Sequence, residues 1–160
     1  MEKVKVGVIG CGCIANAAHI PSYMKCDDAE IKYFCDIVKS KAEKAVEEYK
    51  CGSAIDDYRI ILNDPEIEAV LICSSTDTHS KYIIEAAHAG KHIFCEKPID
   101  YDLSKVHVAI NAAKEAGVKL QIGFCRRFDH NHKAVADAVK DGTIGDPHIV
   151  IVSSRDPEPP

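Results

Sequence analysis

Segments typical of β-strands alternate with segments typical of α-helices along most of this chain, and this alternation constrains the fold more than any other feature. Each apolar or β-branched run is followed by apolar residues at helical spacing. The predicted strands are 3–9, 31–36, 68–74, 92–95 and 118–123, and the predicted helices are 12–25, 39–50, 56–63, 77–89 and 103–116. Because alternating strands and helices form parallel sheets with right-handed crossovers, we predict an α/β fold with a doubly wound parallel sheet.

The first predicted strand leads into a turn that reads Gly-Cys-Gly-Cys-Ile-Ala at positions 10–15, a G-x-G-x-x-A pattern at the start of a predicted helix. In this context Gly10 permits a tight turn and Gly12 lets the backbone approach a pyrophosphate. The N-terminus of the helix favours phosphate there through its free N–H groups and its dipole. We therefore predict a Rossmann domain in which Gly10, Gly12, Cys13 and Ile14 bind a dinucleotide. The alternative is a plain glycine turn.

Asp36 ends the second predicted strand, 24 residues after Gly12. A carboxylate at this place can accept hydrogen bonds from an adenosine ribose, and it would repel a 2′-phosphate. We therefore predict NAD as the cofactor in preference to NADP, although Lys39 is nearby. The alternative for Asp36 is to cap the helix that begins near Val38, and one side chain can fill both roles.

Polar side chains also follow two later strands, at the edge of the sheet where ligands bind in open α/β folds. The first group reads Ser-Ser-Thr-Asp-Thr-His at positions 74–79, and its hydroxyls are predicted beside the nicotinamide half of the cofactor. The alternative is that Thr76 or Asp77 caps the next helix. After the next strand, Lys97 can hydrogen-bond a substrate hydroxyl and stabilise a developing alkoxide. The alternative is a surface lysine paired with Glu96.

Four segments, in order along the chain, resemble the glucose–fructose oxidoreductase / inositol dehydrogenase family. These segments are 6–12, 75–79, 89–98 (with its Glu-Lys-Pro motif) and 123–129, and the resemblance covers nearly the whole chain. Within the family the chain is most similar to the N-terminal part of inositol 2-dehydrogenases, through Arg-Arg-Phe-Asp at 126–129 and the tail at 154–157. The resemblance implies an NAD-dependent enzyme that oxidises a ring hydroxyl of inositol, or of a similar polyol, to a ketone.

The same resemblance implies a role for each matching residue. The glycine loop and Asp36 would hold the adenosine half of NAD, and Lys97 would touch the substrate as the catalytic residue. The other residues expected along the cofactor, or toward the substrate, are Ser74, Thr76, His79, Glu96 and Arg127. Cys125 departs from the Asn that often precedes the Arg-Arg pair in the family.

Two regions are predicted along the chain: a dinucleotide-binding Rossmann domain at 1–123, and at 124–160 a linker helix with the first strand of an incomplete C-terminal substrate and oligomerisation domain. That strand is expected at 148–154, and 134–139 is expected to form an amphipathic core face. The resemblance implies that an Asp and a His follow a proline-rich loop like 156–160. We therefore expect the chain to be a cofactor-binding fragment that is inactive alone, and its unpaired strand predicts a homo-oligomer.

Composition excludes several classes of protein. The net charge of −5 and the absence of Trp argue against a nucleic-acid partner. Residues 6–24 imitate a secretory signal, but their glycines interrupt both a signal and a membrane span. The eight cysteines lie mostly in apolar segments without a Cys-x-x-Cys pair, and His130 and His132 are expected on solvated surface. We therefore predict a cytoplasmic protein without a metal site or membrane partner.

The function that these features favour is that of an NAD-dependent polyol dehydrogenase with a small polyol or sugar substrate. Two alternatives remain at this point. One is another sugar dehydrogenase, or an NAD-assisted glycosidase, of the same family. The other is a non-catalytic NAD-binding module.

Overall fold

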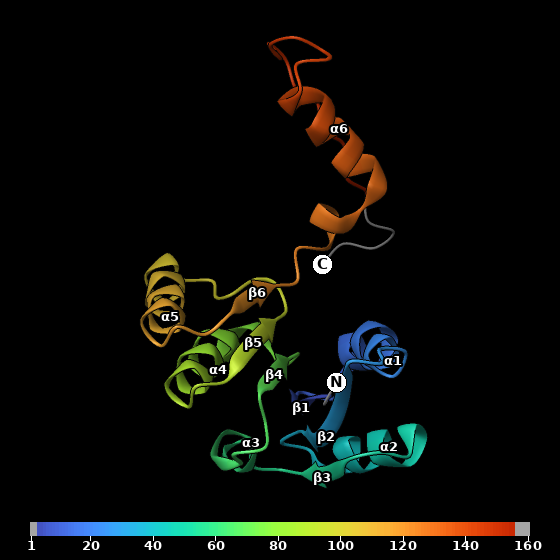
Figure 1. Cartoon of the computed structure of the whole chain (residues 1–160), viewed down its shortest axis with the longest axis vertical. Helices are drawn as coiled ribbons and strands as arrows, with labels where there is room; N and C mark the ends of the chain where they lie inside the picture. The colour runs from blue at the N-terminus through green and yellow to red at the C-terminus, as the bar shows by residue number, and fades with distance from the viewer. Residues whose placement is uncertain (1–2, 156–160) are drawn as a thin grey trace. The chain divides into compact units, whose positions relative to one another are not determined.

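Six parallel strands form the central sheet of the computed structural model, which describes residues 3–155 (Figure 1). The strands are β1 (Val4–Ile9), β2 (Ala29–Cys35), β3 (Ser53–Ile55), β4 (Ala69–Ile72), β5 (His92–Cys95) and β6 (Leu120–Ile122). Their order across the sheet is β3-β2-β1-β4-β5-β6. The predicted α/β fold with a doubly wound parallel sheet is confirmed.

The strand order reverses at β1, and this reversal positions the candidate site. The last residue of β1, Ile9, lies opposite Cys35 of β2 on one side and Ile72 of β4 on the other. The connections after β1 and β4 therefore leave the sheet in opposite directions. In open α/β sheets such a switch point creates a crevice outside the carboxyl ends of the strands.

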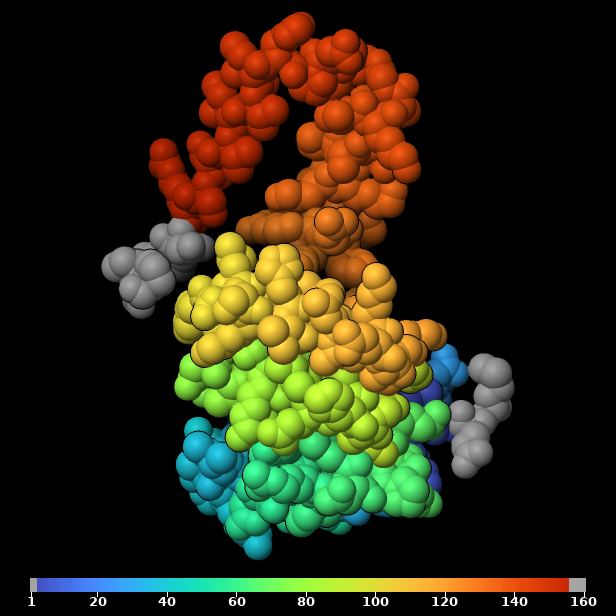
Figure 2. Space-filling view, turned by 90° about the vertical axis from the view of Figure 1, so that its left-hand side faces the viewer, coloured from blue at the N-terminus to red at the C-terminus, as the bar shows by residue number. Residues whose placement is uncertain are grey.

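Helices cover both faces of the sheet, and each face has its own apolar core. The π-helical turn η1 (Ala15–His19), α1 (Ile20–Tyr23) and α2 (Lys39–Tyr49) pack on one face through Ala15, Ile20, Ala42 and Ala45. On the other face lie α3 (Arg59–Asn63), α4 (Thr76–His88) and α5 (Leu103–Glu115), which form successive bands of surface in Figure 2. Alanines at helical spacing in α2, α4 and α5 let these helices lie close to the strands.

Two local features differ from the sequence prediction. The helix predicted at 12–25 forms from Cys13 to Tyr23, but its middle, η1, is π-helical, and Pro21 lies in the first turn of α1, which continues it. Proline lacks an N–H group, so the start of a helix tolerates it better than the middle. The short edge strand β3 was not predicted, since its sequence Ser-Ala-Ile has no alternating pattern.

The described residues divide into two compact units between Gly123 and Phe124. The second unit holds a 3₁₀ turn, η2 (Cys125–Phe128), and α6 (His130–Lys140), whose N-cap Asp129 accepts hydrogen bonds from two backbone N–H groups. The predicted core face at 134–139 is exposed instead: Val135 is 65% and Val139 is 42% exposed. Nothing among the described residues of this unit buries that face.

The strand predicted at 148–154 does not form in the described structure. Ile149, Val150, Ile151 and Val152 are each more than three-quarters exposed. The physical reason is that a strand needs a neighbour to pair with its N–H and C=O groups, and no described segment lies in register with these residues. The proline-rich segment at 156–160 lies outside the described residues.

The eight cysteines are free thiols, and four of them are buried at or just beyond the ends of strands: Cys11, Cys35, Cys73 and Cys95. Burial raises the pKa of Cys11, Cys35 and Cys73 to about 12, so these thiols stay neutral at physiological pH. Residues 3–155 contain no group of three side chains suited to hold a metal ion. Nor does any helix in that range have the length and apolar character needed to cross a bilayer.

Candidate functional site

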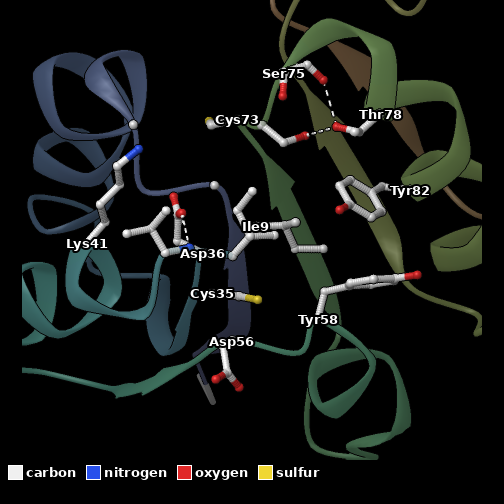
Figure 3. Close-up of a pocket in the computed structure, with 15 residues that line it drawn as sticks. Ile9, Cys35, Asp36, Lys41, Asp56, Tyr58, Cys73, Ser75, Thr78 and Tyr82 are labelled. Atoms are coloured by element: carbon white, nitrogen blue, oxygen red, sulfur yellow. Dashed lines mark hydrogen bonds between the residues drawn. The ribbon is translucent and has the colours of Figure 1, made fainter.

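A cavity of about 380 Å³ lies at the carboxyl ends of β1, β2 and β4, at the switch point of the sheet (Figure 3). Asp36 and Lys41 stand on one side of it, and Ser75, Thr78 and Tyr82 on the other. Its volume falls within the range of small-molecule sites. The lining residues are Ile9, Gly10, Gly12, Cys35, Asp36, Ile37, Val38, Lys41, Asp56, Tyr58, Cys73, Ser74, Ser75, Thr78 and Tyr82.

The glycine turn forms one wall of this cavity, and its two glycines serve different purposes. Gly10 has a φ of +98°, and a Cβ atom there would lie 2.6 Å from the backbone of Cys73 and Ser74. The turn therefore requires glycine for the protein's own packing. A Cβ atom on Gly12 would meet no atom within 4 Å, so the space beside it is open to a ligand. The Asn16 amide holds the turn by donating to the carbonyl oxygens of Cys11 and Gly12, each at 2.9 Å.

Asp36 connects the glycine turn to the start of α2. One carboxylate oxygen accepts a hydrogen bond from the backbone N–H of Cys11, and the other accepts one from Val38, both at 2.9 Å. Asp36 therefore binds the backbone just before α2 and also lines the cavity, but no side chain caps α2 itself. Each carboxylate oxygen has a second lone pair, so Asp36 can still accept hydrogen bonds from a bound hydroxyl.

Apolar and aromatic residues make up part of the cavity wall, and we call this part the apolar slot: Ile37, Val38, Tyr58 and Tyr82. Ile37 is 88% exposed although it is a large apolar residue, and Val38 is 46% exposed beside it. The rings of Tyr58 and Tyr82 pack with centroids 4.6 Å apart. Burial, and then the hydrogen bond from its hydroxyl to Glu85, raise the pKa of Tyr58 to about 12, so this ring is neutral. A slot of this kind suits a flat, uncharged ring such as a nucleobase.

The hydroxyl groups beyond β4 are only partly those that the sequence predicted. The Ser74 and Thr78 hydroxyls lie 2.8 Å apart and both line the cavity, together with Ser75. Thr76, which was predicted along the cofactor, is half-buried and is not among the residues that line this cavity. Thr78 belongs to the predicted group at 74–79 but was not singled out as a site residue, and its position four residues after Ser74, across the first turn of α4, is a signal that favours it.

His79 lies elsewhere than the resemblance implied. It is buried, and its two ring nitrogens face backbone carbonyls: Nδ1 is 2.7 Å from the oxygen of Pro98, and Nε2 is 2.9 Å from that of Ser74. It is absent from the cavity wall. The ring therefore packs between the turn after β4 and the loop after β5, with each nitrogen within hydrogen-bond distance of a carbonyl from one of these two segments.

A second group of side chains lies at the carboxyl end of β5. The Lys97 side chain is exposed, and no ion pair of Lys97 occurs within residues 3–155, so the surface pair with Glu96 does not form. The carboxylate of Glu96 instead accepts a hydrogen bond from Nε2 of His19 at 2.6 Å. Sequence reasoning missed His19, since 77 residues separate it from Glu96.

The remaining predicted residues do not line the main cavity. Cys13 and Ile14 are exposed just beyond the glycine turn, and Cys13 lines a neighbouring cavity of about 310 Å³ together with Lys41. Arg127 is an exposed residue of η2 in the second unit. Lining residues that sequence reasoning missed include Asp56 and Tyr58, which lie in short connections without a recognisable motif.

Known proteins with similar sequences are oxidoreductases. Residues 4–124 match the model of a family described as an oxidoreductase family with an NAD-binding Rossmann fold. A myo-inositol 2-dehydrogenase from Thermotoga maritima is 41% identical over 157 residues, which are 98% of this chain and 47% of that protein. The chain spans about half the length of the curated relatives that it matches.

The solved structures that resemble this chain include a dehydrogenase and a ketoreductase. A protein described as a probable dehydrogenase from Thermotoga maritima has a TM-score of 0.82 at 39% identity, over 91% of this chain and 43% of that chain. A 3-ketoreductase from Actinomadura kijaniata, solved in complex with NADP, has a TM-score of 0.81 at 28% identity, over 91% of this chain and 46% of that chain.

Proposed function

Because the chain belongs to the oxidoreductase family with an NAD-binding Rossmann fold, we propose that it is the cofactor-binding part of a polyol dehydrogenase. The substrate that we propose is inositol or a similar polyol, with one ring hydroxyl oxidised to a ketone. Similarity to the myo-inositol 2-dehydrogenase of Thermotoga maritima supports this substrate class. The observation that carries the proposal is the cavity at the switch point, with the glycine turn and Asp36 in its wall.

The adenosine half of NAD fits the side of the cavity formed by β1 and β2. The open space beside Gly12 suits the pyrophosphate, and the apolar slot at Ile37 and Tyr58 suits the adenine ring. The free lone pairs of Asp36 suit the ribose hydroxyls. The carboxylate would repel the 2′-phosphate of NADP, which supports NAD as the preferred cofactor.

The nicotinamide half would then extend past the switch point, toward the ends of β4 and β5. Bound NAD supplies the acceptor for the hydride that leaves the substrate carbon. In this proposal the Lys97 ammonium donates a hydrogen bond to the reacting hydroxyl and stabilises negative charge on its oxygen as the proton leaves. A neutral imidazole is better suited than Lys97 to take that proton, because a charged lysine must first lose one of its own.

The substrate and the role of Lys97 are tested together in the native gene product. We expect it to form NADH with inositol faster than with other polyols. Lys97→Ala should lower kcat by about 10²-fold and change the Kd for NAD by less than about threefold, because Lys97 acts at the reacting end. Lys105→Ala, an exposed lysine on α5, is the matched control. Normal turnover by the Lys97 variant would show that Lys97 is a surface lysine without a catalytic role.

The 160-residue chain itself should bind NAD but turn over inositol poorly. The resemblance implies that the proton-accepting Asp and His follow a loop like 156–160, so the rate of these 160 residues alone should be about 10²–10⁴-fold below that of an ordinary dehydrogenase. Calorimetric titration with NAD and the rate of NADH formation measure the two properties separately. Turnover at an ordinary rate would contradict this part of the proposal, and failure to bind NAD would contradict all of it.

A second candidate is a reductase that acts on a keto sugar. The structural similarity to the NADP-bound 3-ketoreductase favours it. Asp36 argues against NADP, so this candidate predicts that the native gene product oxidises NADH in the presence of keto sugars and leaves inositol unchanged. Product analysis with both substrate classes separates the two candidates.

A further inference from the structure

His19 and Glu96 form a largely buried pair that joins the two halves of the candidate site. His19 is the last residue of η1, which follows the glycine turn, whereas Glu96 directly follows β5. Nε2 of His19 donates to Oε1 of Glu96 at 2.6 Å, and the two side chains are 17% and 13% exposed. The His19 ring also packs edge-on against Phe94 of β5, with centroids 5.1 Å apart.

The Glu96 carboxylate is held on its other sides as well. Its second oxygen, Oε2, accepts a hydrogen bond from the backbone N–H of Lys97 at 3.1 Å. Gly123 lies against the carboxylate so closely that a Cβ atom there would be 2.9 Å from Oε1. Each oxygen of Glu96 thus has a partner within the chain, and the space around the group is filled.

These contacts help to fix the backbone of Lys97, together with the bonds from the Glu96 N–H to the Ile72 carbonyl and between His79 and the Pro98 carbonyl. Lys97 is exposed and has no ion pair among the described residues, so its position depends on its backbone. The backbone N–H of Lys97 donates a hydrogen bond to the Glu96 carboxylate, and the same carboxylate accepts a hydrogen bond from His19. Displacement of a catalytic group by about 1 Å can cost a factor of about 10² in rate, so such a contact matters for chemistry beyond its value for stability.

We propose that His19 is a positioning residue: through Glu96 it fixes Lys97 at the nicotinamide end of the cofactor site. This inference deepens the proposed function and rests on it. Two observations carry it, namely the His19–Glu96 hydrogen bond and the bond from the same carboxylate to the backbone N–H of Lys97. A purely structural pair is the competing explanation, and it would lower stability and cofactor affinity without acting through Lys97.

A double-mutant cycle in the native gene product separates these explanations. We expect His19→Ala to lower kcat about tenfold or more, with the KM for NAD changed less than about threefold. In a Lys97→Ala background the same change should cost less than about twofold, because the group that His19 positions is already gone. His19→Gln, whose amide N–H can still donate to Glu96, should recover most of the rate. Equal losses in both backgrounds would overturn the proposal, as would a fall in NAD affinity that matches the loss of rate.

A second measurement uses the 160-residue chain and needs no turnover. Amide hydrogen exchange at Lys97 should become about tenfold faster in His19→Ala and return toward the original rate in His19→Gln, because the Lys97 N–H is held through Glu96. Exchange at Val70 in the core of β4 should be unchanged, which controls for folding. If the native product shows no NAD-dependent turnover, the proposed function fails while this measurement still decides whether His19 positions Lys97. Unchanged exchange at Lys97 would overturn the inference.

Discussion

The two ends of the parallel sheet differ in how far their charged side chains are paired within the chain. At the amino ends of the strands, Lys32 pairs with Asp64 at 2.6 Å and also with Glu66, while Lys5 pairs with Glu66 at 3.0 Å. The buried ammonium of Lys91 donates to two backbone carbonyls there, at 2.7 and 2.8 Å. These groups find partners within the chain.

At the carboxyl ends Glu96 is paired with His19, but other charged groups are left open. Asp36 binds only backbone N–H groups, and within residues 3–155 Lys41 and Lys97 have no ion pair. Charge that is satisfied within the chain stabilises the fold, whereas charge left open beside a cavity is available to a ligand. Changes at the amino ends should therefore alter stability alone, whereas changes at the carboxyl ends should alter binding.

The largest effect is expected from Gly10→Ala, which changes the backbone just after the carboxyl end of β1. The new Cβ would lie 2.6 Å from backbone atoms of Cys73 and Ser74 at a φ of +98°, so we expect a loss of at least about 3 kcal/mol in the free energy of unfolding and no measurable NAD binding. Gly90→Ala is the control, since Gly90 has a φ of +71° but open space around it, and it should cost about 1 kcal/mol. Urea unfolding measures both. Equal losses for the two variants would show that the close approach at Gly10 is unimportant.

Lys91→Met tests the amino end with a side chain of similar length. The half-buried carbonyl of Asp64 and the buried carbonyl of Ile67 lose their donor, so the free energy of unfolding should fall by about 2 kcal/mol. The Kd for NAD should stay within about twofold, because the ligand site lies at the other end of the sheet. Lys105→Met, at an exposed position, is the control for removal of a lysine. A larger effect on NAD affinity than on stability would contradict the expectation that the amino ends of the strands contribute to stability and not to binding.

A smaller effect is expected from acid. The hydrogen bond from Lys32, and then the backbone N–H of Glu66, lower the pKa of Asp64 from 3.8 to about 2. Because the folded state holds this proton less tightly than the unfolded state, the pair stabilises the protein above pH 4 and the stabilisation is lost as the pH falls from about 4 to 2. Asp64→Asn should remove this part of the pH dependence, as measured by urea unfolding at pH 7 and pH 3. If the free energy of unfolding falls equally between pH 7 and pH 3 in the variant and the parent chain, the assignment to Asp64 is contradicted.

Local patterns predicted much of the fold and part of the site. The run at 92–95 is β5, and the run at 68–74 contains β4, because buried parallel strands are continuous apolar segments bounded by polar residues. The glycine turn and Asp36 were predicted from their order along the chain, and the structure brings them together through the Cys11 N–H. The resemblance to the oxidoreductase family is confirmed by the match over residues 4–124.

Features that depend on distant contacts were not predictable in the same way. The sequence near His19 indicates a helix but carries no sign of Glu96, because the contact exists only after β1 and β5 take their places in one sheet. His79 stands in a polar segment that reads as a ligand site, yet the fold buries its ring against two carbonyls. The apolar run at 148–154 predicts a strand, but pairing requires a neighbour that the described residues do not supply.

We propose above that the open carboxylate of Asp36, at the carboxyl end of β2, binds the ribose of NAD. Calorimetric titration of the 160-residue chain with NAD and NADP tests it, with Asp36→Asn to remove the charge at constant shape and Asp56→Asn as a matched acid in the same cavity wall. We predict that the parent chain and the Asp56 variant bind NAD at least about tenfold more tightly than NADP, and that Asp36→Asn reduces this preference to within about threefold. Equal or tighter binding of NADP by the parent chain, or an unchanged preference in Asp36→Asn, would contradict the account.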